Sequence, residues 1–166
     1  MGKSWKGGAE VKQIIALKIN GSTYEVAAEP RDTLLEMVRQ LGFKGTKEAC
    51  GLGECGTCTV IIDGAPVLAC LTLAVEAQGK EITTVEGLSE GQKLHPVQKA
   101  FVEQGAIQCG FCTPGMIIAA KALLDENPDP GAEEIDTALG GHLCRCTGYV
   151  KIRKAVRAAG QALRSK

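Results

Sequence analysis

Apolar positions follow strand-like patterns through the first half of the chain, interrupted by one helical pattern. Two β-rich runs, residues 11–20 and 22–29, flank the dipeptide Asn20-Gly21. Asparagine and glycine both tolerate positive φ, so this dipeptide favours a tight hairpin turn. The sequence therefore predicts a β-hairpin at the start of the fold.

One short helix is expected directly after this hairpin. Residues 32–41 place leucine and valine at helical spacing, with Asp32 as the expected N-cap and Gly42 as the stop. After a loop rich in glycine and cysteine, the pattern predicts a strand over 58–62, a turn at Asp63-Gly64, an apolar stretch over 67–75 and a strand over 81–85. Strands that pack with one helix form an α+β module.

The pattern becomes helical after residue 93. Four segments carry apolar residues on one helical face, and the first of these faces holds Leu94, Val97 and Phe101. The other three lie within residues 117–124, 132–139 and 152–163. We expect an α+β protein with domains at residues 1–86 and 94–166, joined by a polar, glycine-containing linker at 87–93.

Charge and composition exclude several classes of protein. The 166 residues carry 19 basic and 19 acidic side chains, whereas proteins that bind nucleic acid or anionic lipid normally carry a basic excess. No apolar run approaches the roughly 20 residues that a membrane-spanning helix needs. Residues 1–8 show no secretory signal. We therefore expect a cytoplasmic protein that has neither nucleic acid nor membrane as a partner.

Eight cysteines are many for a reducing compartment, where metal sites are more frequent than disulfides. The first four have the spacing C-x4-C-x2-C-x11-C, and plant-type [2Fe–2S] ferredoxins open with the same C-x4-C-x2-C. They are Cys50, Cys55, Cys58 and Cys70. Gly51, Gly53 and Gly56 lie between the first three and let the loop turn inward repeatedly.

The second four cysteines lie in the helical half with the spacing C-x2-C-x31-C-x-C. They are Cys109, Cys112, Cys144 and Cys146. Cys112 precedes Thr113-Pro114, which is expected to open a helix with Thr113 as N-cap, and Cys146 precedes Thr147 and the last helix. We therefore expect each pair at a helix N-terminus, where an anionic cluster is stabilised, with approximate twofold symmetry.

Three segments resemble the small iron–sulfur subunit of the molybdenum hydroxylase (xanthine oxidase) family: GTKEACGLGECGTCTV, QCGFCTPGM and LCRCTGYVKI. The resemblance spans about residues 11–163, and similar small subunits belong to aerobic carbon monoxide dehydrogenase, 4-hydroxybenzoyl-CoA reductase and nicotinate dehydrogenase. It implies a plant-type ferredoxin-like (β-grasp) domain and a C-terminal four-helix-bundle domain, each with one [2Fe–2S] cluster.

The same resemblance implies a function and a set of partners. The chain would be the electron-transfer subunit of a heterotrimer and would not itself be the catalyst. Electrons would pass singly from a large molybdopterin subunit, through the C-terminal and then the N-terminal cluster, to an FAD subunit or another acceptor. The eight cysteines would be the cluster ligands, and Gln108 and Cys146 would contact the pterin. Two residues depart from the usual family pattern: Ala49 replaces glycine, and His142 replaces asparagine.

Other interpretations of the cysteines stay open at this point. These are a disulfide framework, two all-cysteine zinc sites, a redox-active C-x-x-C at Cys109 and Cys112, and a free-standing two-cluster carrier or binding module. His142 is either a metal ligand or an ordinary loop residue, and His95 is expected to cap a helix. Residues 145–166 hold seven basic side chains and no acidic one, which predicts a solvated face or a docking surface for an acidic partner.

Overall fold

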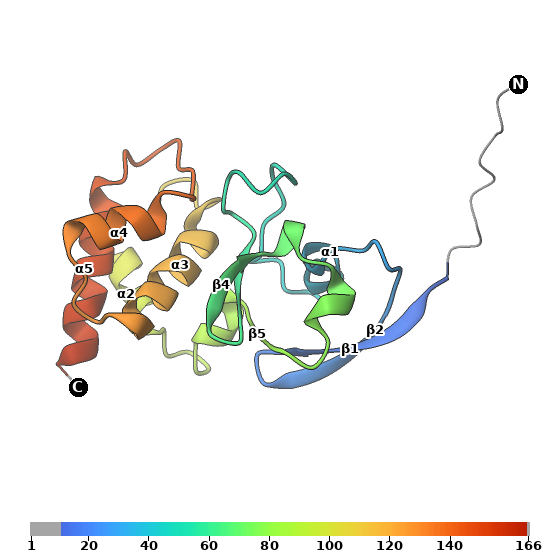
Figure 1. The fold of residues 1–166 in the computed structure, drawn as a ribbon. Helices are drawn as coiled ribbons and strands as arrows, with labels where there is room; N and C mark the ends of the chain where they lie inside the picture. The colour runs from blue at the N-terminus through green and yellow to red at the C-terminus, as the bar shows by residue number, and fades with distance from the viewer. Residues whose placement is uncertain (1–10, 166) are drawn as a thin grey trace, which may run out of the picture.

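The structure, a computed structural model, describes residues 11–165, which form a mixed sheet followed by a group of helices (Figure 1). The strands are β1 (Gln13–Ile19), β2 (Ser22–Ala28), β3 (Thr59–Ile62), β4 (Ala65–Leu68) and β5 (Glu81–Thr83). They lie in the order β2-β1-β5-β3-β4, with β1 and β5 parallel and the other neighbours antiparallel. The predicted mixture of sheet and helices is confirmed.

Both predicted tight turns are present. Asn20 and Gly21 join β1 to β2 with φ angles of 52° and 78°, and Asp63 and Gly64 join β3 to β4 with φ angles of 50° and 87°. The apolar stretch at 67–75 is not one element. It finishes β4 and continues into two 3₁₀ helices, η1 (Ala69–Leu71) and η2 (Ala74–Ala77).

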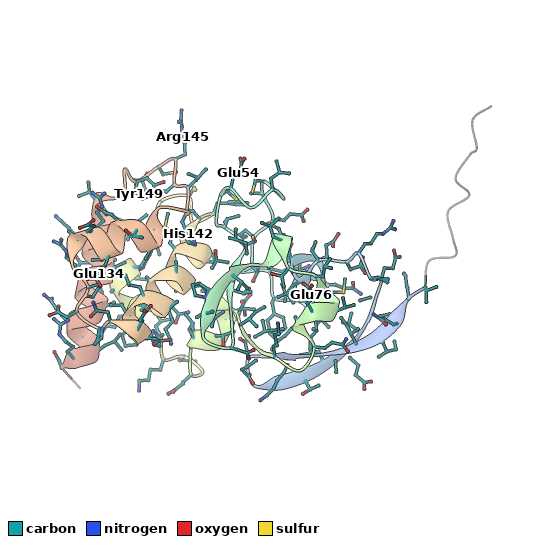
Figure 2. All side chains as sticks on the ribbon, viewed as in Figure 1. Glu54, Glu76, Glu134, His142, Arg145 and Tyr149 are labelled. Carbon is teal, nitrogen blue, oxygen red and sulfur yellow. The ribbon has the colours of Figure 1, made fainter. Side chains whose placement is uncertain are left out.

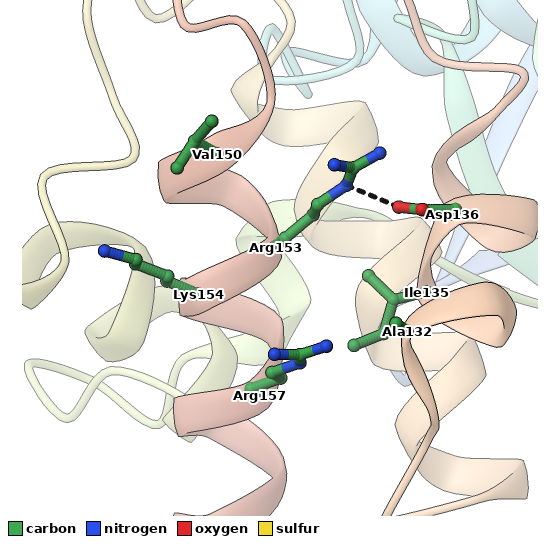
Figure 3. Close-up of a pocket in the computed structure, with 7 residues that line it drawn as sticks. All are labelled: Ala132, Ile135, Asp136, Val150, Arg153, Lys154 and Arg157. Carbon is green, nitrogen blue, oxygen red and sulfur yellow. Dashed lines mark ion pairs between the residues drawn. The ribbon is translucent and has the colours of Figure 1, made fainter.

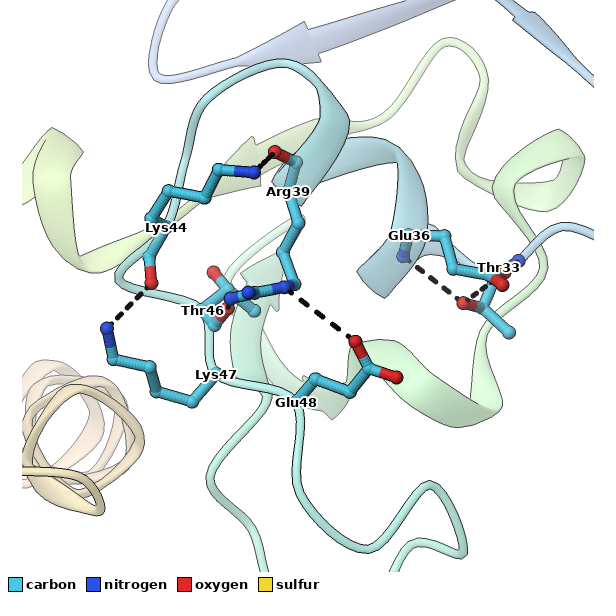
Figure 4. Close-up of polar contacts among 7 residues, drawn as sticks. All are labelled: Thr33, Glu36, Arg39, Lys44, Thr46, Lys47 and Glu48. Atoms are coloured by element: carbon cyan, nitrogen blue, oxygen red, sulfur yellow. Dashed lines mark hydrogen bonds and ion pairs between the residues drawn. The ribbon is translucent and has the colours of Figure 1, made fainter.

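Helix α1 (Leu34–Gln40) begins later than the sequence analysis predicts, because Thr33 and not Asp32 is its N-cap. The Thr33 hydroxyl accepts a hydrogen bond from the Glu36 amide at 3.2 Å, and the Glu36 carboxylate accepts one from the Thr33 amide at 2.7 Å (Figure 4). This reciprocal capping box satisfies two amides that the helix leaves free. Asp32 instead accepts from the Glu29 amide at 2.7 Å and closes the preceding turn.

The first half has its own hydrophobic core between the sheet and α1. Alternate residues of β1 face inward, so Ile15, Leu17 and Ile19 are buried while their neighbours are exposed. Helix α1 contributes Leu34 and Val38, both fully buried. The core therefore uses both periodicities that the sequence displays, two for the strand and 3.6 for the helix.

The second half contains α2 (Pro96–Glu103), α3 (Thr113–Glu126), α4 (Ala132–Leu139) and α5 (Val150–Arg164). Phe101, Met116, Ile135 and Ile152, one from each helix, are almost completely buried in a second core. The four predicted helical segments are confirmed, except that Leu94 precedes α2 and remains 45% exposed. His95 is the N-cap of α2, as predicted, and its Nδ1 accepts from the Val97 amide.

The two halves are in direct contact. Helix α3 packs against β3 and β4, and the 3₁₀ helix η3 (Val85–Leu88) leads from the sheet into the helices. Gly87 lies so close to Asn20 that a Cβ at Gly87 would approach the Asn20 Oδ1 to 2.0 Å, while Leu88 is buried in the second core. Across residues 11–165, none of the helices combines the length and the apolarity that crossing a membrane requires.

Candidate metal sites formed by eight cysteines

The first group of cysteines is held by the loop before β3 and by η1. Gly51, Gly53 and Gly56 all have positive φ, between 65° and 80°, so the loop reverses direction several times between Cys50 and Cys58. The Cys55 thiol lies close enough to the Cys50 thiol to lower the pKa of Cys50. The other two cysteines form a second pair, Cys58 with Cys70, and both are buried.

The entry to this loop is fixed by a residue that the sequence analysis missed. Arg39, on α1, donates from Nη1 to the carbonyl of Thr46 at 2.7 Å, and its Nε lies 3.9 Å from the Glu48 carboxylate (Figure 4). Lys44 donates to the Arg39 carbonyl at 2.5 Å. Helix α1 thus anchors residues 44–48 directly before Cys50. An arginine at the end of a helix carries no sequence signal for this contact.

The second group also forms pairs. The Cys146 Sγ lies 3.6 Å from the Cys109 Sγ, and both residues are exposed. The Cys112 and Cys144 thiols lie close enough to affect each other's pKa, and both residues are partly buried. Gln108 is exposed beside Cys109. The second group therefore has an outer pair at the surface and an inner pair against the second core.

The helix ends differ from the prediction at this site. Cys112 itself is the N-cap of α3, and Thr113 lies in the first turn. Cys146 does not precede a helix directly, because α5 begins only at Val150. Tyr149 has a left-handed backbone with φ 65°, and its hydroxyl accepts from the Cys144 amide at 2.9 Å. This turn separates Cys146 from the helix, so the two cysteine pairs do not meet their helices in the same way, and the approximate twofold symmetry stays a prediction.

Hydrogen bonds and burial act differently on the thiols. The Leu52 amide, which donates to the Cys50 Sγ at 3.5 Å, is the largest influence in lowering the pKa of Cys50 to about 6. Burial raises the pKa of Cys58 to about 11 and that of Cys112 to about 12. For Cys144, burial opposes ionisation, but hydrogen bonds led by that of Thr147 lower its pKa. Metal binding requires thiolates, so protons leave the buried thiols when metal enters.

The pairwise arrangement indicates which metal group the cysteines fit. Within the described part of the chain, no three His, Cys, Asp or Glu side chains converge as a single ion requires. All eight cysteines are free thiols, so they form no disulfide framework. A zinc site needs four ligands around one ion, whereas a [2Fe–2S] centre takes two cysteines on each of two irons. Two thiol pairs per group fit the binuclear centre.

The comparison with known proteins agrees with this chemistry. Residues 17–87 match the 2Fe-2S iron-sulfur cluster binding domain, and residues 84–157 match the [2Fe-2S] binding domain. The nicotinate dehydrogenase small FeS subunit of Eubacterium barkeri is 52% identical over 149 residues, covering 89% of this chain and 95% of that protein. This chain belongs to the small iron–sulfur subunits of the molybdenum hydroxylase family.

Other relatives place this small iron–sulfur subunit in the same family. The xanthine dehydrogenase iron-sulfur-binding subunit of Escherichia coli O157:H7 is 46% identical over 144 residues, which cover 86% of this chain and 91% of that one. A chain of quinoline 2-oxidoreductase from Pseudomonas putida 86 is 46% identical and superposes with a TM-score of 0.88, covering 93% of this chain and 97% of the other. The resemblance seen in the sequence is confirmed, and the subunit is part of an oxidoreductase with two [2Fe–2S]-binding domains.

His142 and Ala49, the two departures from the family pattern, have different surroundings. Ala49 is exposed before the first cysteine. His142 is buried, and its Nε2 lies 2.9 Å from the Thr59 hydroxyl. Burial lowers the pKa of His142, with a smaller opposing effect from the Ala138 backbone. The contact with Thr59 therefore joins the loop before Cys144 to β3. The His142 Nε2 thus faces a threonine hydroxyl and not a cysteine thiol.

Proposed function

We propose that the small iron–sulfur subunit relays single electrons from a molybdopterin-binding subunit to an FAD-binding subunit or another acceptor. The route runs through the second group of cysteines and then through the first. The observation that carries this proposal is the exposure gradient of the second group: Cys109 and Cys146 are exposed, whereas Cys112 and Cys144 are partly buried toward the rest of the chain. When bound, each [2Fe–2S] centre supplies a one-electron redox site.

The two groups of cysteines are proposed as separate ligand sets. Cys50, Cys55, Cys58 and Cys70 hold the first centre, and Cys109, Cys112, Cys144 and Cys146 hold the second. The pairing of thiols inside each group supports this division, because each iron takes two cysteines. The glycines of the first loop let backbone amides such as that of Leu52 approach sulfur and stabilise negative charge.

Each ligand set is proposed to define one domain. A ferredoxin-like β-grasp domain covers residues 1–86, and a four-helix-bundle domain covers 94–166, with 87–93 between them. The separate hydrophobic cores of the two halves support this division. Leu88, near the start of the connecting segment 87–93, belongs to the second core, so this segment is attached to the helical half from its beginning.

The outer face of the second site is proposed as the contact with the molybdopterin subunit. Gln108 and Cys146 are the residues expected to touch the pterin, and both are exposed. Phe111 and Leu143, which flank the inner cysteines, are 48% and 58% exposed. Exposed apolar side chains around an exposed ligand pair are typical of a surface that a partner covers.

A second contact is proposed on the basic face of α5, in the groove between α4 and α5. Arg153, Lys154 and Arg157 line this groove; Figure 3 shows Arg153 and Arg157 extending from α5 toward α4, where the Arg153 Nε forms an ion pair with Asp136 at 2.5 Å, and Lys154 extending from the other side of α5. No ion pair joins Lys154 or Arg157 to another residue in the described range. Their free charges support docking of an acidic segment of a partner subunit in a cytoplasmic heterotrimer.

The test is to purify the subunit without oxygen together with its partners. We expect a brown preparation with about four iron and four sulfide per chain, two distinct electron-spin resonance signals after reduction, and a bound molybdenum subunit. Zinc in place of iron would refute the ligand proposal. Full iron loading without any molybdenum partner would support a free-standing carrier and would refute the proposed relay.

A further inference from the structure

The two cysteine loops, which are far apart in the sequence, contact each other directly. The Leu143 amide donates to the Cys55 carbonyl at 3.0 Å, and the Thr57 hydroxyl donates to the Phe111 carbonyl at 3.0 Å. Figure 2 shows Glu54 on the first loop and Arg145 on the second extending from the same side of the molecule. Leu143 and Phe111 are the immediate neighbours of the inner cysteines of the second group.

The backbones of the two loops fit together without room for side chains. A Cβ at Gly56 would approach the Gly141 carbonyl to 2.5 Å and the His142 ring to 2.6 Å. A Cβ at Gly115 would approach the Gly56 carbonyl to 2.4 Å. Real Cβ atoms do not tolerate such distances from backbone atoms, because the neighbour cannot move aside. The positions of the loops are therefore fixed closely.

His142 is the side chain that joins these loops. The Thr59 hydroxyl donates its single proton to the Gly56 carbonyl at 2.6 Å, so at its 2.9 Å contact with His142 it must accept from Nε2–H. The ring is then the Nε2–H tautomer, packed against Gly56. His142 also provides its carbonyl to the Tyr149 hydroxyl at 3.1 Å. One residue thus connects β3, the first loop and the second loop.

The other ring nitrogen of His142 indicates that stability alone does not explain this residue. Nδ1 is buried and makes no hydrogen bond of normal distance and angle among the described residues, although the Ala138 backbone lies close enough to the ring to affect its pKa. A buried polar atom without a partner weakens the folded state and requires another reason for its presence. The geometry provides such a reason. The His142 ring holds Thr59, which follows Cys58, in a fixed position close to the Leu143–Cys55 hydrogen bond.

We propose that His142 is a positioning residue that holds the Leu143–Cys55 hydrogen bond as the bonded electron route between the two cysteine sites. The route leaves Cys144 through its peptide bond to Leu143, crosses one N–H to carbonyl hydrogen bond, and enters Cys55. This inference rests on the proposed relay function. One electron crosses in each step, no covalent bond forms or breaks, and the reductant is the molybdenum-containing partner of that function.

The test compares His142→Ala and His142→Gln in the complex purified with its partners. Two readouts are used: the splitting that the two reduced centres cause in each other's electron-spin resonance lines, and the delay between their reduction in freeze-quench experiments. We expect His142→Ala to reduce the splitting and to lengthen the delay severalfold while both signals persist. The amide nitrogen of glutamine can reach the position of the histidine Nε2 and donate to Thr59, so His142→Gln should remain close to the wild type.

Two controls separate this role from a structural one. Gly141→Ala changes the neighbouring residue where an added Cβ meets nothing within 4 Å, and it should leave both readouts unchanged. If His142→Ala fails to hold iron, Thr59→Val removes the acceptor instead and should give the same reduced splitting. A merely structural His142 would lower the melting temperature and leave the splitting unchanged.

The outcomes distinguish the inference from the function on which it rests. If the wild-type complex shows two reduced signals and a normal relay, but His142→Ala or Thr59→Val with both centres loaded keeps the wild-type splitting and delay, the positioning role is wrong. If the wild-type complex itself lacks two coupled signals, the proposed relay fails instead. Neither result can be mistaken for the other, because iron content and both signals are measured in every sample.

Discussion

Gly115→Ala is the sharpest test of how closely the two cysteine loops fit. Gly115 lies in the first turn of α3, where alanine would ordinarily be the better residue by about 1 kcal/mol of helix propensity. Its φ is not in the left-handed region, so an added methyl group causes no backbone strain. A helix considered alone would therefore be stabilised by this substitution.

The contact with the first loop reverses this expectation. The new Cβ would lie 2.4 Å from the Gly56 carbonyl oxygen and 3.1 Å from the Thr57 Cα, whereas ordinary contact begins at 3.4 Å. Relief needs a displacement of about 1 Å between α3 and the loop, the difference between 3.4 and 2.4 Å. Overpacking of this kind costs about 1–3 kcal/mol. Because the clash is with backbone atoms, which cannot turn aside, the upper part of this range, about 2–3 kcal/mol, applies, and after the propensity gain of about 1 kcal/mol a net loss of roughly 1–2 kcal/mol remains.

The assay is the apparent melting temperature of the iron-loaded protein at one fixed scan rate. For a chain of this length about 2–4 °C corresponds to each kcal/mol, so Gly115→Ala should lower the melting temperature by about 2–8 °C. Gly141→Ala is the matched control, because nothing lies within 4 Å of the new Cβ, and it should stabilise by about 0.4–1 kcal/mol. A Gly115→Ala protein that melts at or above the wild type would refute the close fit of the loops.

Three further predictions concern the sites and their surroundings. Cys112→Ala should leave about two iron per chain and only the first centre's spin-resonance signal, and retention of both signals would contradict the ligand assignment. Arg39→Ala leaves the carbonyl of buried Thr46 without its donor, so it should lower the free energy of unfolding by about 1–3 kcal/mol. It should also speed the loss of iron from the first site to a chelator, and an unchanged rate would contradict the role of Arg39 as an anchor. Reversing Lys154 and Arg157 to glutamate should weaken partner binding about tenfold at low salt and less at high salt, measured by co-purification, and no change at either salt would exclude this face as a docking surface.

Local sequence chemistry was sufficient for much of the fold. The hairpin at Asn20-Gly21 and the turn at Asp63-Gly64 follow from residues that tolerate positive φ, and the structure has both. The start of α1 was also encoded locally, since Thr33 and Glu36 have the spacing of a capping box. The prediction of Asp32 as the N-cap was wrong because Asp32 and Thr33, both capping residues, are adjacent, and only Thr33 completes the capping box with Glu36.

The joining of the two sites could not be predicted from the sequence in the same way. Thr59 and His142 are 83 positions apart, and neither has a pattern that indicates the other. The same is true of Arg39 and the loop entry, because the contact depends on where α1 ends relative to residues 44–48. Cysteine spacing reports which thiols belong together, whereas only tertiary packing places one group against the other.

The exposed cysteine pair and the buried contact between the two loops both suit an electron relay. A relay needs ligands that a partner can approach at one end and a well-defined, water-poor contact in the middle. Cys109 and Cys146 are exposed, whereas His142 and Thr59 are buried where the loops meet. Because the crossing at Leu143 and Cys55 is made by backbone groups, exposed side chains can be substituted without removing either group of the proposed route.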